Sequence, residues 1–159
     1  MKIQVNISQQ TLALFDDAGK LVRRYAVSTA LNGAGEEANS NCTPRGRHVI
    51  RAKIGTGLPL NTVFVRRRPS RELYTPALGM QYPERDWILT RILWLSGCES
   101  GYNRSGSCDT MRRYIYIHGT TNERGVGVPR SHGCINMLND DLLELFELVE
   151  VGTIVDISV

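Results

Sequence analysis

Two histidines and a cysteine lie close together in the second half of the chain, and these side chain types can act on a carbonyl group. They fall in residues 118–136, HGTTNERGVGVPRSHGCIN. A thiolate is a strong nucleophile, but its thiol needs a neighbour that lowers the pKa. An imidazole can do this and can then protonate a leaving amine as general acid. The segment therefore predicts Cys134 as a nucleophile with an imidazole partner.

The residue before the cysteine favours the same chemistry. Gly133 has no side chain that would shield the sulfur, and it lets backbone N–H groups approach a developing oxyanion. Each lost donor of this kind typically costs about 2.7–4 kcal/mol in the transition state. We therefore expect a backbone oxyanion site beside Cys134.

Two short motifs in this segment are similar to those of a known family. HGT stands at 118–120 and SHGCIN at 131–136, separated by a glycine-rich stretch. In this order and spacing they resemble the L,D-transpeptidase catalytic domain, or YkuD, family. QVNISQQTLALFDDAGKLVRRYAVST near the N-terminus and TPRG at 43–46 resemble the family's opening strands and a turn. The resemblance covers nearly the whole chain.

The resemblance implies acyl transfer on the stem peptides of peptidoglycan. The family cleaves tetrapeptides after the L-centre of the third residue, often meso-diaminopimelate, and expels the terminal D-Ala. Cys134 would form the thioester and His118 would be its acid–base partner, with the Gly119 carbonyl orienting the His118 ring. No cofactor or metal is expected. Carbapenem-type inhibitors are possible ligands of the same site.

The remaining motif residues have implied roles around the nucleophile. Ser131 and His132 would support the loop, and Gly133 and Cys134 would donate the oxyanion N–H groups. Asn136 is an expected substrate contact that stands where many relatives carry arginine. Any carboxylate contact made by that arginine would therefore come from another residue here.

Arginine supplies 16 of the 19 basic residues, which suits a substrate rich in carboxylates. We expect substrate contacts from Arg91, Arg113 and Arg130, and from Tyr116, which stands two residues before His118. A solvated arginine surface is the plainer alternative. The net charge of +3 is too small to predict nucleic acid, so the run 66–68 indicates a solvated face or a small-anion contact.

Two alternatives stay open for the reactive segment. Cys134 could be a buried structural cysteine, and the chain could then be an inactive peptidoglycan-binding module. His118, His132 and Cys134 could instead hold a metal, although no CxxC or HxxxH pair is present. His48 lies on a predicted strand and is expected to be a surface or hydrogen-bonded histidine.

The apolar pattern predicts a mainly β fold in one domain, residues 1–159. We expect a β-sandwich or barrel-like mixed sheet, of the type the resemblance implies, with one C-terminal helix packed on it. The helix would begin at Asn139 as N-cap. Residues 55–86 are expected to be irregular and 96–112 to form a mobile flap. Strands are predicted at 2–7, 11–16, 21–28, 47–54, 87–95, 114–117 and 153–159, with His118 at the end of the sixth.

The first 15 residues have no continuous apolar region, and no segment is long enough to span a membrane. We therefore expect a cytoplasmic protein with reduced thiols, or a periplasmic one if an export signal has been removed. Cys98 and Cys108 would be the best pair for a disulfide. A cytoplasmic enzyme would meet recycled muropeptides, which favours an L,D-carboxypeptidase with water as acceptor. The alternative is an L,D-transpeptidase in wall cross-linking or D-amino-acid exchange.

Overall fold

Eight strands close into a barrel in the computed structural model, which describes residues 1–159. The barrel strands are β1 (Lys2–Asn6), β2 (Thr11–Phe15), β3 (Leu21–Ser28), β4 (Gly46–Ile54), β7 (Ile88–Gly97), β8 (Tyr116–Thr120), β9 (Ile135–Leu138) and β10 (Ile154–Ser158). The other elements are β5 (Thr62–Val65), β6 (Arg68–Leu73), α1 (Pro76–Gln81), the 3₁₀ helix η1 (Gly106–Cys108) and α2 (Asn139–Leu148). Neither α-helix has the length and apolar character needed to cross a bilayer.

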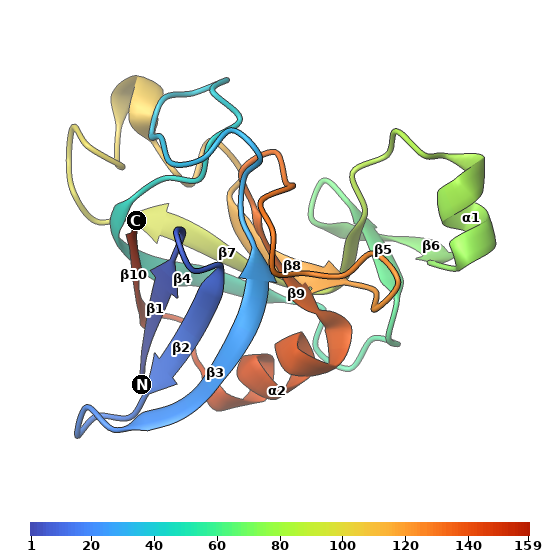
Figure 1. The fold of residues 1–159 in the computed structure, drawn as a ribbon, viewed down its shortest axis with the longest axis horizontal. Helices are drawn as coiled ribbons and strands as arrows, with labels where there is room; N and C mark the ends of the chain where they lie inside the picture. Colours follow the sequence, from blue (N-terminus) through green and yellow to red (C-terminus); the bar gives the residue numbers. More distant parts are fainter.

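The strands run around the ring in the order β4-β10-β1-β2-β3-β9-β8-β7, and β7 pairs back onto β4. The pairs β1–β10 and β8–β9 are parallel and the other barrel pairs are antiparallel. Figure 1 shows the β5–β6 hairpin and α1 projecting to one side of this ring. The expected mainly β, mixed-sheet fold is confirmed.

A single large apolar core fills the barrel and continues under α2. Helix α2 packs against β7, β8 and β9 (Figure 1) and buries Leu142, Leu145 and Phe146. The predicted C-terminal helix is therefore confirmed, and it covers the two strands that precede and follow the reactive segment.

The prediction of Asn139 as N-cap is wrong, because Leu138 occupies that position. The Asn139 side chain makes tertiary hydrogen bonds instead. Its Oδ1 accepts from Thr90 Oγ1 at 2.7 Å and its Nδ2 donates to Asn61 Oδ1 at 2.7 Å. The amide therefore ties the start of α2 to β7 and to the segment before β5.

The prediction that residues 55–86 are irregular is also wrong. The β5–β6 hairpin and α1 lie there. The hairpin turns at Arg66 and Arg67, which are not the glycine or asparagine residues that mark most two-residue turns. Helix α1 does have a sequence signal, because Thr75 caps the Leu78 N–H at 3.1 Å and Pro76 is its first residue.

The loop after β7 is held by buried polar contacts. Asn103 is fully buried and donates to the carbonyls of Arg45 and Arg47 at 3.1 and 3.0 Å. His48, also fully buried, contacts Thr110 Oγ1 through Nε2 at 2.9 Å. These anchors are a correction to the mobile flap expected over 96–112, and they show His48 as a hydrogen-bonded structural histidine.

All four cysteines are free thiols. Cys98 is exposed, whereas Cys108 is buried and its Sγ lies 3.2 Å from the Ser105 carbonyl oxygen. The Cys98–Cys108 pair considered from the sequence is therefore not a disulfide in this structure.

Candidate active site

The parallel pair β8–β9 brings the two reactive side chains to one face of the barrel wall. Ile117 lies opposite Ile135 and His118 opposite Asn136. Because strand residues alternate between faces, Cys134 and His118 share the face of Tyr116. His118 lies in the middle of β8, not at the end of a strand as predicted, since β8 continues to Thr120.

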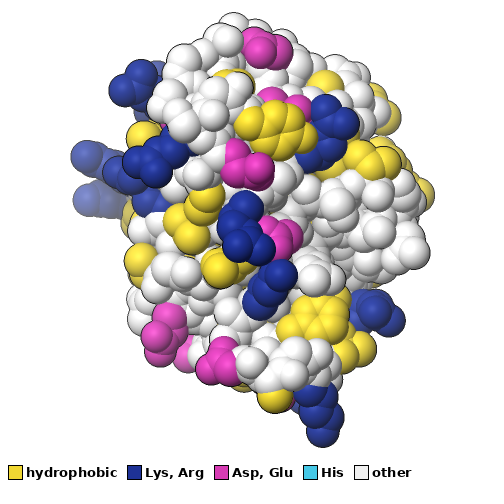
Figure 2. Space-filling view, turned by 90° about the vertical axis from the view of Figure 1, so that its left-hand side faces the viewer, with side chains coloured by type: hydrophobic (Ala, Val, Ile, Leu, Met, Phe, Trp, Pro, Cys, Tyr) yellow, Lys and Arg dark blue, Asp and Glu magenta, His cyan; other side chains and the backbone are white.

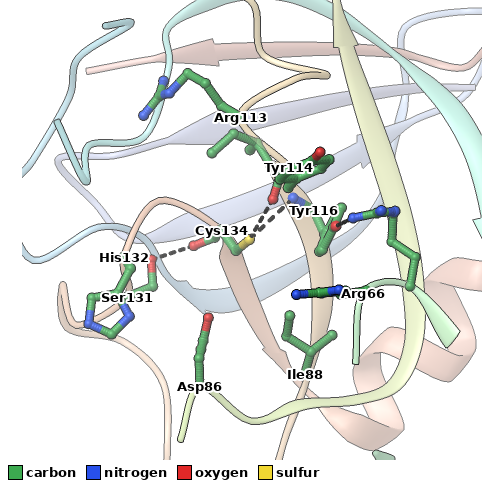
Figure 3. Close-up of a pocket in the computed structure, with 11 residues that line it drawn as sticks. Arg66, Asp86, Ile88, Arg113, Tyr114, Tyr116, Ser131, His132 and Cys134 are labelled. Atoms are coloured by element: carbon green, nitrogen blue, oxygen red, sulfur yellow. Dashed lines mark hydrogen bonds between the residues drawn. The ribbon is translucent and has the colours of Figure 1, made fainter. Parts of the chain in front are cut away.

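Cys134 is partly buried, and two backbone groups of the neighbouring strand contact its sulfur. The Tyr116 N–H donates to Sγ at 3.3 Å, and Sγ lies 3.4 Å from the Tyr114 carbonyl oxygen as a donor. Figure 3 shows both contacts at the centre of a pocket. The thiol is therefore held as a neutral donor at the mouth of this pocket.

The His118 ring is buried and fixed by one hydrogen bond. Its Nδ1 lies 3.0 Å from the Gly119 carbonyl oxygen, as the resemblance implies. A carbonyl only accepts, so Nδ1 carries the proton and Nε2 carries the lone pair. Nε2 is buried without any hydrogen-bond partner. Such a nitrogen is available to take a proton from a thiol that turns toward it.

Both reactive groups rest uncharged near neutral pH. Burial raises the pKa of the Cys134 thiol to about 12, and the Asp86 carboxylate adds to this, whereas the Tyr116 N–H and Arg113 oppose it. Burial lowers the pKa of His118, against the opposing effects of Asp86 and the Gly119 carbonyl. Activation therefore requires a proton transfer between two neutral groups.

Two positions near the nucleophile require glycine for different reasons. At Gly119 a Cβ atom would stand 2.2 Å from Asn139 Oδ1 and 2.7 Å from the Leu89 carbonyl oxygen. Gly133 has a φ of 135°, and a Cβ there would stand 3.2 Å from the Cys42 carbonyl oxygen. The strand pair thus needs the close approach at Gly119, and the turn before Cys134 needs a backbone that other residues rarely adopt.

Ser131 and Thr43 hold the loop that presents Cys134. Ser131 Oγ donates to the Cys134 carbonyl at 2.5 Å and accepts from the Gly133 N–H at 3.1 Å. Thr43 Oγ1 donates to the Gly133 carbonyl at 2.9 Å and accepts from the Ala30 N–H at 2.9 Å. Gly133 N–H, expected as an oxyanion donor, is therefore engaged by Ser131 in this state.

A cavity of about 440 Å³ opens directly above the sulfur. Figure 3 shows Arg66, Asp86 and Tyr114 around it, with the Asp86 carboxylate directed toward the side of Ser131 and Cys134. Arg66, Arg67 and Asp86 line the cavity and were not predicted as site residues from the sequence. The full lining consists of Arg66, Arg67, Asp86, Ile88, Arg113, Tyr114, Ile115, Tyr116, Ser131, His132 and Cys134.

Of the expected substrate contacts, Tyr116 and Arg113 line this cavity. Tyr116 is buried and its hydroxyl accepts from Arg67 at 2.9 Å. The Arg113 guanidinium is engaged elsewhere, because it donates to the carbonyl oxygens of Gly35, Glu36 and Cys42. Arg113 therefore ties the loop at 35–42 to the pocket wall, and its contact with substrate stays a prediction.

Arg91, also an expected substrate contact, does not line this cavity. It follows Thr90 in the irregular stretch where the pairing of β7 with β8 shifts register. Its guanidinium is buried and donates to the carbonyls of Leu58 and Thr90 at 2.9 and 2.6 Å. The residue pattern does not reveal this bulge.

A second, smaller cavity of about 150 Å³ adjoins the first and has no hydrophobic lining residue. Arg130 and Asn136 line this cavity instead of the main one. Arg130 donates to the Gly125 carbonyl at 2.7 Å, and Asn136 Oδ1 is buried without a partner. Asp86, Ser131 and His132 line both cavities, so these three residues mark the boundary beside Cys134.

His132 is exposed at this boundary. No group of three or more His, Cys, Asp and Glu side chains is arranged to hold a metal ion. The alternative of a metal site at His118, His132 and Cys134 therefore finds no support in the geometry.

Comparison with known proteins matches almost the entire chain to one family. The family model described as the L,D-transpeptidase catalytic domain, YkuD, matches residues 1–157. The Escherichia coli K12 protein named "Probable L,D-transpeptidase YbiS" is 49% identical over 41 residues, which are 26% of this chain and 13% of that protein.

Two solved structures share the fold at low sequence identity. The L,D-transpeptidase from Mycobacterium smegmatis has a TM-score of 0.61 and 19% identity, covering 99% of this chain and 58% of that chain. L,D-transpeptidase 3 from Mycobacterium tuberculosis, in complex with a faropenem-derived adduct, has a TM-score of 0.59 and 16% identity, covering 99% and 59%. The chain thus spans less than two thirds of each of these three relatives.

Proposed function

The chain belongs to the L,D-transpeptidase catalytic domain (YkuD) family, and we propose that it cleaves the L,D peptide bond of peptidoglycan stem tetrapeptides through a Cys134 thioester. One observation carries this proposal. A partly buried thiol stands at a cavity on the same face of β8–β9 as a buried imidazole whose Nε2 has no partner. A structural cysteine gives no reason for an orphaned histidine nitrogen on the same face.

The first step is formation of the thioester. The thiol proton passes to His118 Nε2, and the sulfur attacks the carbonyl carbon of the third residue. Rotation of the sulfur toward His118 frees the Tyr116 N–H, which then faces the cavity as a candidate oxyanion donor. His118 next protonates the nitrogen of the terminal D-Ala, and the C–N bond breaks.

The acceptor completes the cycle. We propose water, because the smaller cavity beside Cys134 is polar throughout and holds about 150 Å³, which suits solvent and a departing D-amino acid. His118 takes a proton from the water, the water attacks the thioester, and the thiol leaves with that proton. An amine acceptor is the second candidate, favoured by the Asp86 carboxylate between the two cavities, which could hold an ammonium group.

The test is incubation of a disaccharide-tetrapeptide with the protein, followed by mass spectrometry. We expect release of D-Ala to give the tripeptide, loss of this activity in Cys134→Ala, and full activity in the matched control Cys98→Ala, since Cys98 is exposed and does not line the cavity. Added D-amino acid separates the two acceptors. Exchange of the D-amino acid or cross-linked dimers would show that the acceptor is an amine and not water. An active Cys134→Ala variant would contradict the proposal.

Two further expectations belong to this proposal. A carbapenem should acylate Cys134 and add its mass to the protein, which would also exclude an inactive binding module. Recycled muropeptides in the cytoplasm are the proposed source of substrate. Fractionation of cells that express the full-length gene product tests this, and recovery in the envelope would contradict it.

A further inference from the structure

The tip of the β5–β6 hairpin presents two consecutive arginines in an unfavourable backbone conformation. Arg66 and Arg67 both have positive φ values, 50° and 66°, and together form the two-residue connection between the strands. Such turns usually contain asparagine or glycine, because other side chains strain the backbone there. A strained turn of this kind indicates that the side chains themselves have a use.

The Arg67 guanidinium is fixed against the aromatic wall of the active site. Its central carbon lies 4.4 Å from the ring centre of Tyr114 and 5.0 Å from that of Trp94. Its Nη1 donates to the Tyr116 hydroxyl at 2.9 Å. Tyr114 and Tyr116 also supply the backbone groups that contact Cys134 Sγ. These two tyrosines therefore contact both the Arg67 guanidinium and the Cys134 sulfur.

No carboxylate of the protein neutralises this pair of arginines. Arg66 and Arg67 take part in none of the six ion pairs of the molecule. Asp86 is the only acidic residue that lines the main cavity. A guanidinium has five N–H donors, and its planar fork fits a carboxylate through two parallel hydrogen bonds. Both arginines also line the cavity, so a carboxylate of a bound ligand would fit this pair of unpaired guanidiniums.

Resting on the proposed function, we propose that the Arg66–Arg67 turn binds a side-chain carboxylate on the third residue of the stem peptide. That residue carries the carbonyl attacked by Cys134, so its side chain must lie against the wall of the same cavity. The enzyme would select stems with a diaminodicarboxylic acid, such as meso-diaminopimelate. It would discriminate against stems with lysine, or with this carboxyl group amidated.

The experiment combines a substitution of Arg67 with a change of the third residue in the substrate. Three tetrapeptides are compared, with meso-diaminopimelate, its side-chain amide or L-lysine at the third position. Release of D-Ala gives kcat/KM for the wild type, for Arg67→Gln and for the control Arg68→Gln. Arg68 is the next residue, is exposed and does not line the cavity. Thermal melting confirms that each variant is folded.

We expect the wild type to prefer the free carboxylate about ten- to hundredfold, the usual range for a hydrogen bond to a charged group. Arg67→Gln should remove this preference by slowing only that substrate, and Arg68→Gln should retain it. An equal loss on all three substrates would mean that Arg67 only supports the wall. A wild type without preference, or with a preference for lysine, would overturn the proposal.

Binding separates this proposal from the proposed function. Calorimetry with the Cys134→Ala protein measures the affinity of the same three peptides without turnover. Tighter binding of the free carboxylate, lost on adding Arg67→Gln, would support the arginine turn even if the wild type releases no D-Ala. Equal affinity for the three peptides would reject the turn as a selector even in an active enzyme.

Discussion

Cys134 and His118 rest as a neutral pair, since burial raises the pKa of the thiol to about 12 and lowers the pKa of the imidazole. The sulfur also donates to the Tyr114 carbonyl instead of to His118. A substrate carbonyl entering the cavity would displace the sulfur from this contact. We therefore expect substrate binding, and not the resting state, to activate Cys134.

This resting state predicts how the free protein reacts with iodoacetamide. Only the thiolate reacts, and the fraction of thiolate rises about tenfold per pH unit below the pKa. We therefore expect slow alkylation of Cys134 at pH 7 and a steady rise up to pH 10, measured by mass spectrometry of the labelled peptide. Cys134→Ala identifies the site. Fast alkylation that does not change between pH 6 and 9 would instead indicate a thiolate–imidazolium pair at rest.

The HGT and SHGC motifs are local, so the sequence alone could single out Cys134 and His118 as the candidate nucleophile and its partner. The residues of the surrounding pocket could not be predicted. Arg66 and Asp86 come from a segment without any motif, and only the fold brings them beside Cys134. The guanidiniums of Arg91 and Arg113 donate to backbone carbonyls, and a residue pattern does not reveal such contacts.

At the scale of elements, the turn at 43–46 supports the catalytic loop through Thr43. Thr43→Val keeps the side chain's shape but leaves the Ala30 N–H and the Gly133 carbonyl without their partner. We expect a loss of about 1–3 kcal/mol in the free energy of unfolding, the usual cost of unsatisfied buried groups. We also expect slower D-Ala release per folded molecule. Urea titration and the release assay measure the two effects.

The matched control for this prediction is Thr43→Ser, which retains the hydroxyl and should keep most of the activity. A Thr43→Val protein that loses stability but keeps its full kcat would show that the turn supports the fold alone. That result would also mean that the position of Gly133 does not limit the rate of the reaction.

His48 anchors the loop at 98–113 to β4 and makes the fold sensitive to acid. Burial lowers its pKa to about 4 from the ordinary 6.5. Between about pH 6.5 and 4 the His48 imidazole is therefore protonated in the unfolded chain but neutral in the folded protein. The free energy of unfolding consequently falls as the pH drops through this range. The full effect is about 3 kcal/mol. Urea titrations across this range should show the loss in the wild type and a smaller one in His48→Gln. Equal pH dependence of both proteins would contradict this prediction.

Seven of the eight barrel strands could be predicted from their apolar patterns, such as the alternation in β1, but β9 (Ile135–Leu138) was not among them. The hairpin at 62–73 could not be predicted, because its turn lacks glycine and its outer strand β6 is mostly exposed. Similarly, Asn139 has the residue type of a helix cap, but tertiary partners compete for its amide. Local preference fails in both places because contacts with distant residues decide the outcome.

At the scale of the whole molecule, charges of both signs are mixed over the barrel, whereas three arginines and one aspartate line the main cavity. On the face turned away from the hairpin, acidic side chains lie among the basic ones (Figure 2). Ion pairs such as Arg47–Asp156 and Arg45–Glu36 satisfy arginines outside the site. The unpaired arginines of the hairpin therefore give the cavity a local positive charge that the small net charge of +3 does not reveal.

Closure of the barrel also leaves β6 as the one strand with a free edge. Pro69 and the charged residues Arg68, Arg71 and Glu72 lie along it. Proline and charge on an edge strand oppose pairing with another molecule. The ring itself has no exposed edge, and this condition depends on β10, which pairs with β1 on one side and β4 on the other.

Removing β10 should therefore do more than shorten the chain. A stop after Thr153 leaves β1 and β4 with unpaired backbone groups and removes Val155 and Ile157 from the core. Because open apolar edges pair between molecules, we expect aggregation, seen as a void-volume peak in size-exclusion chromatography. The control ends at Ser158 and lacks only the exposed Val159, so it should elute as the intact protein does. A truncated chain that stays monomeric with an intact β-type circular dichroism spectrum would mean that the remaining strands protect their own edges, and that β10 is dispensable for closure.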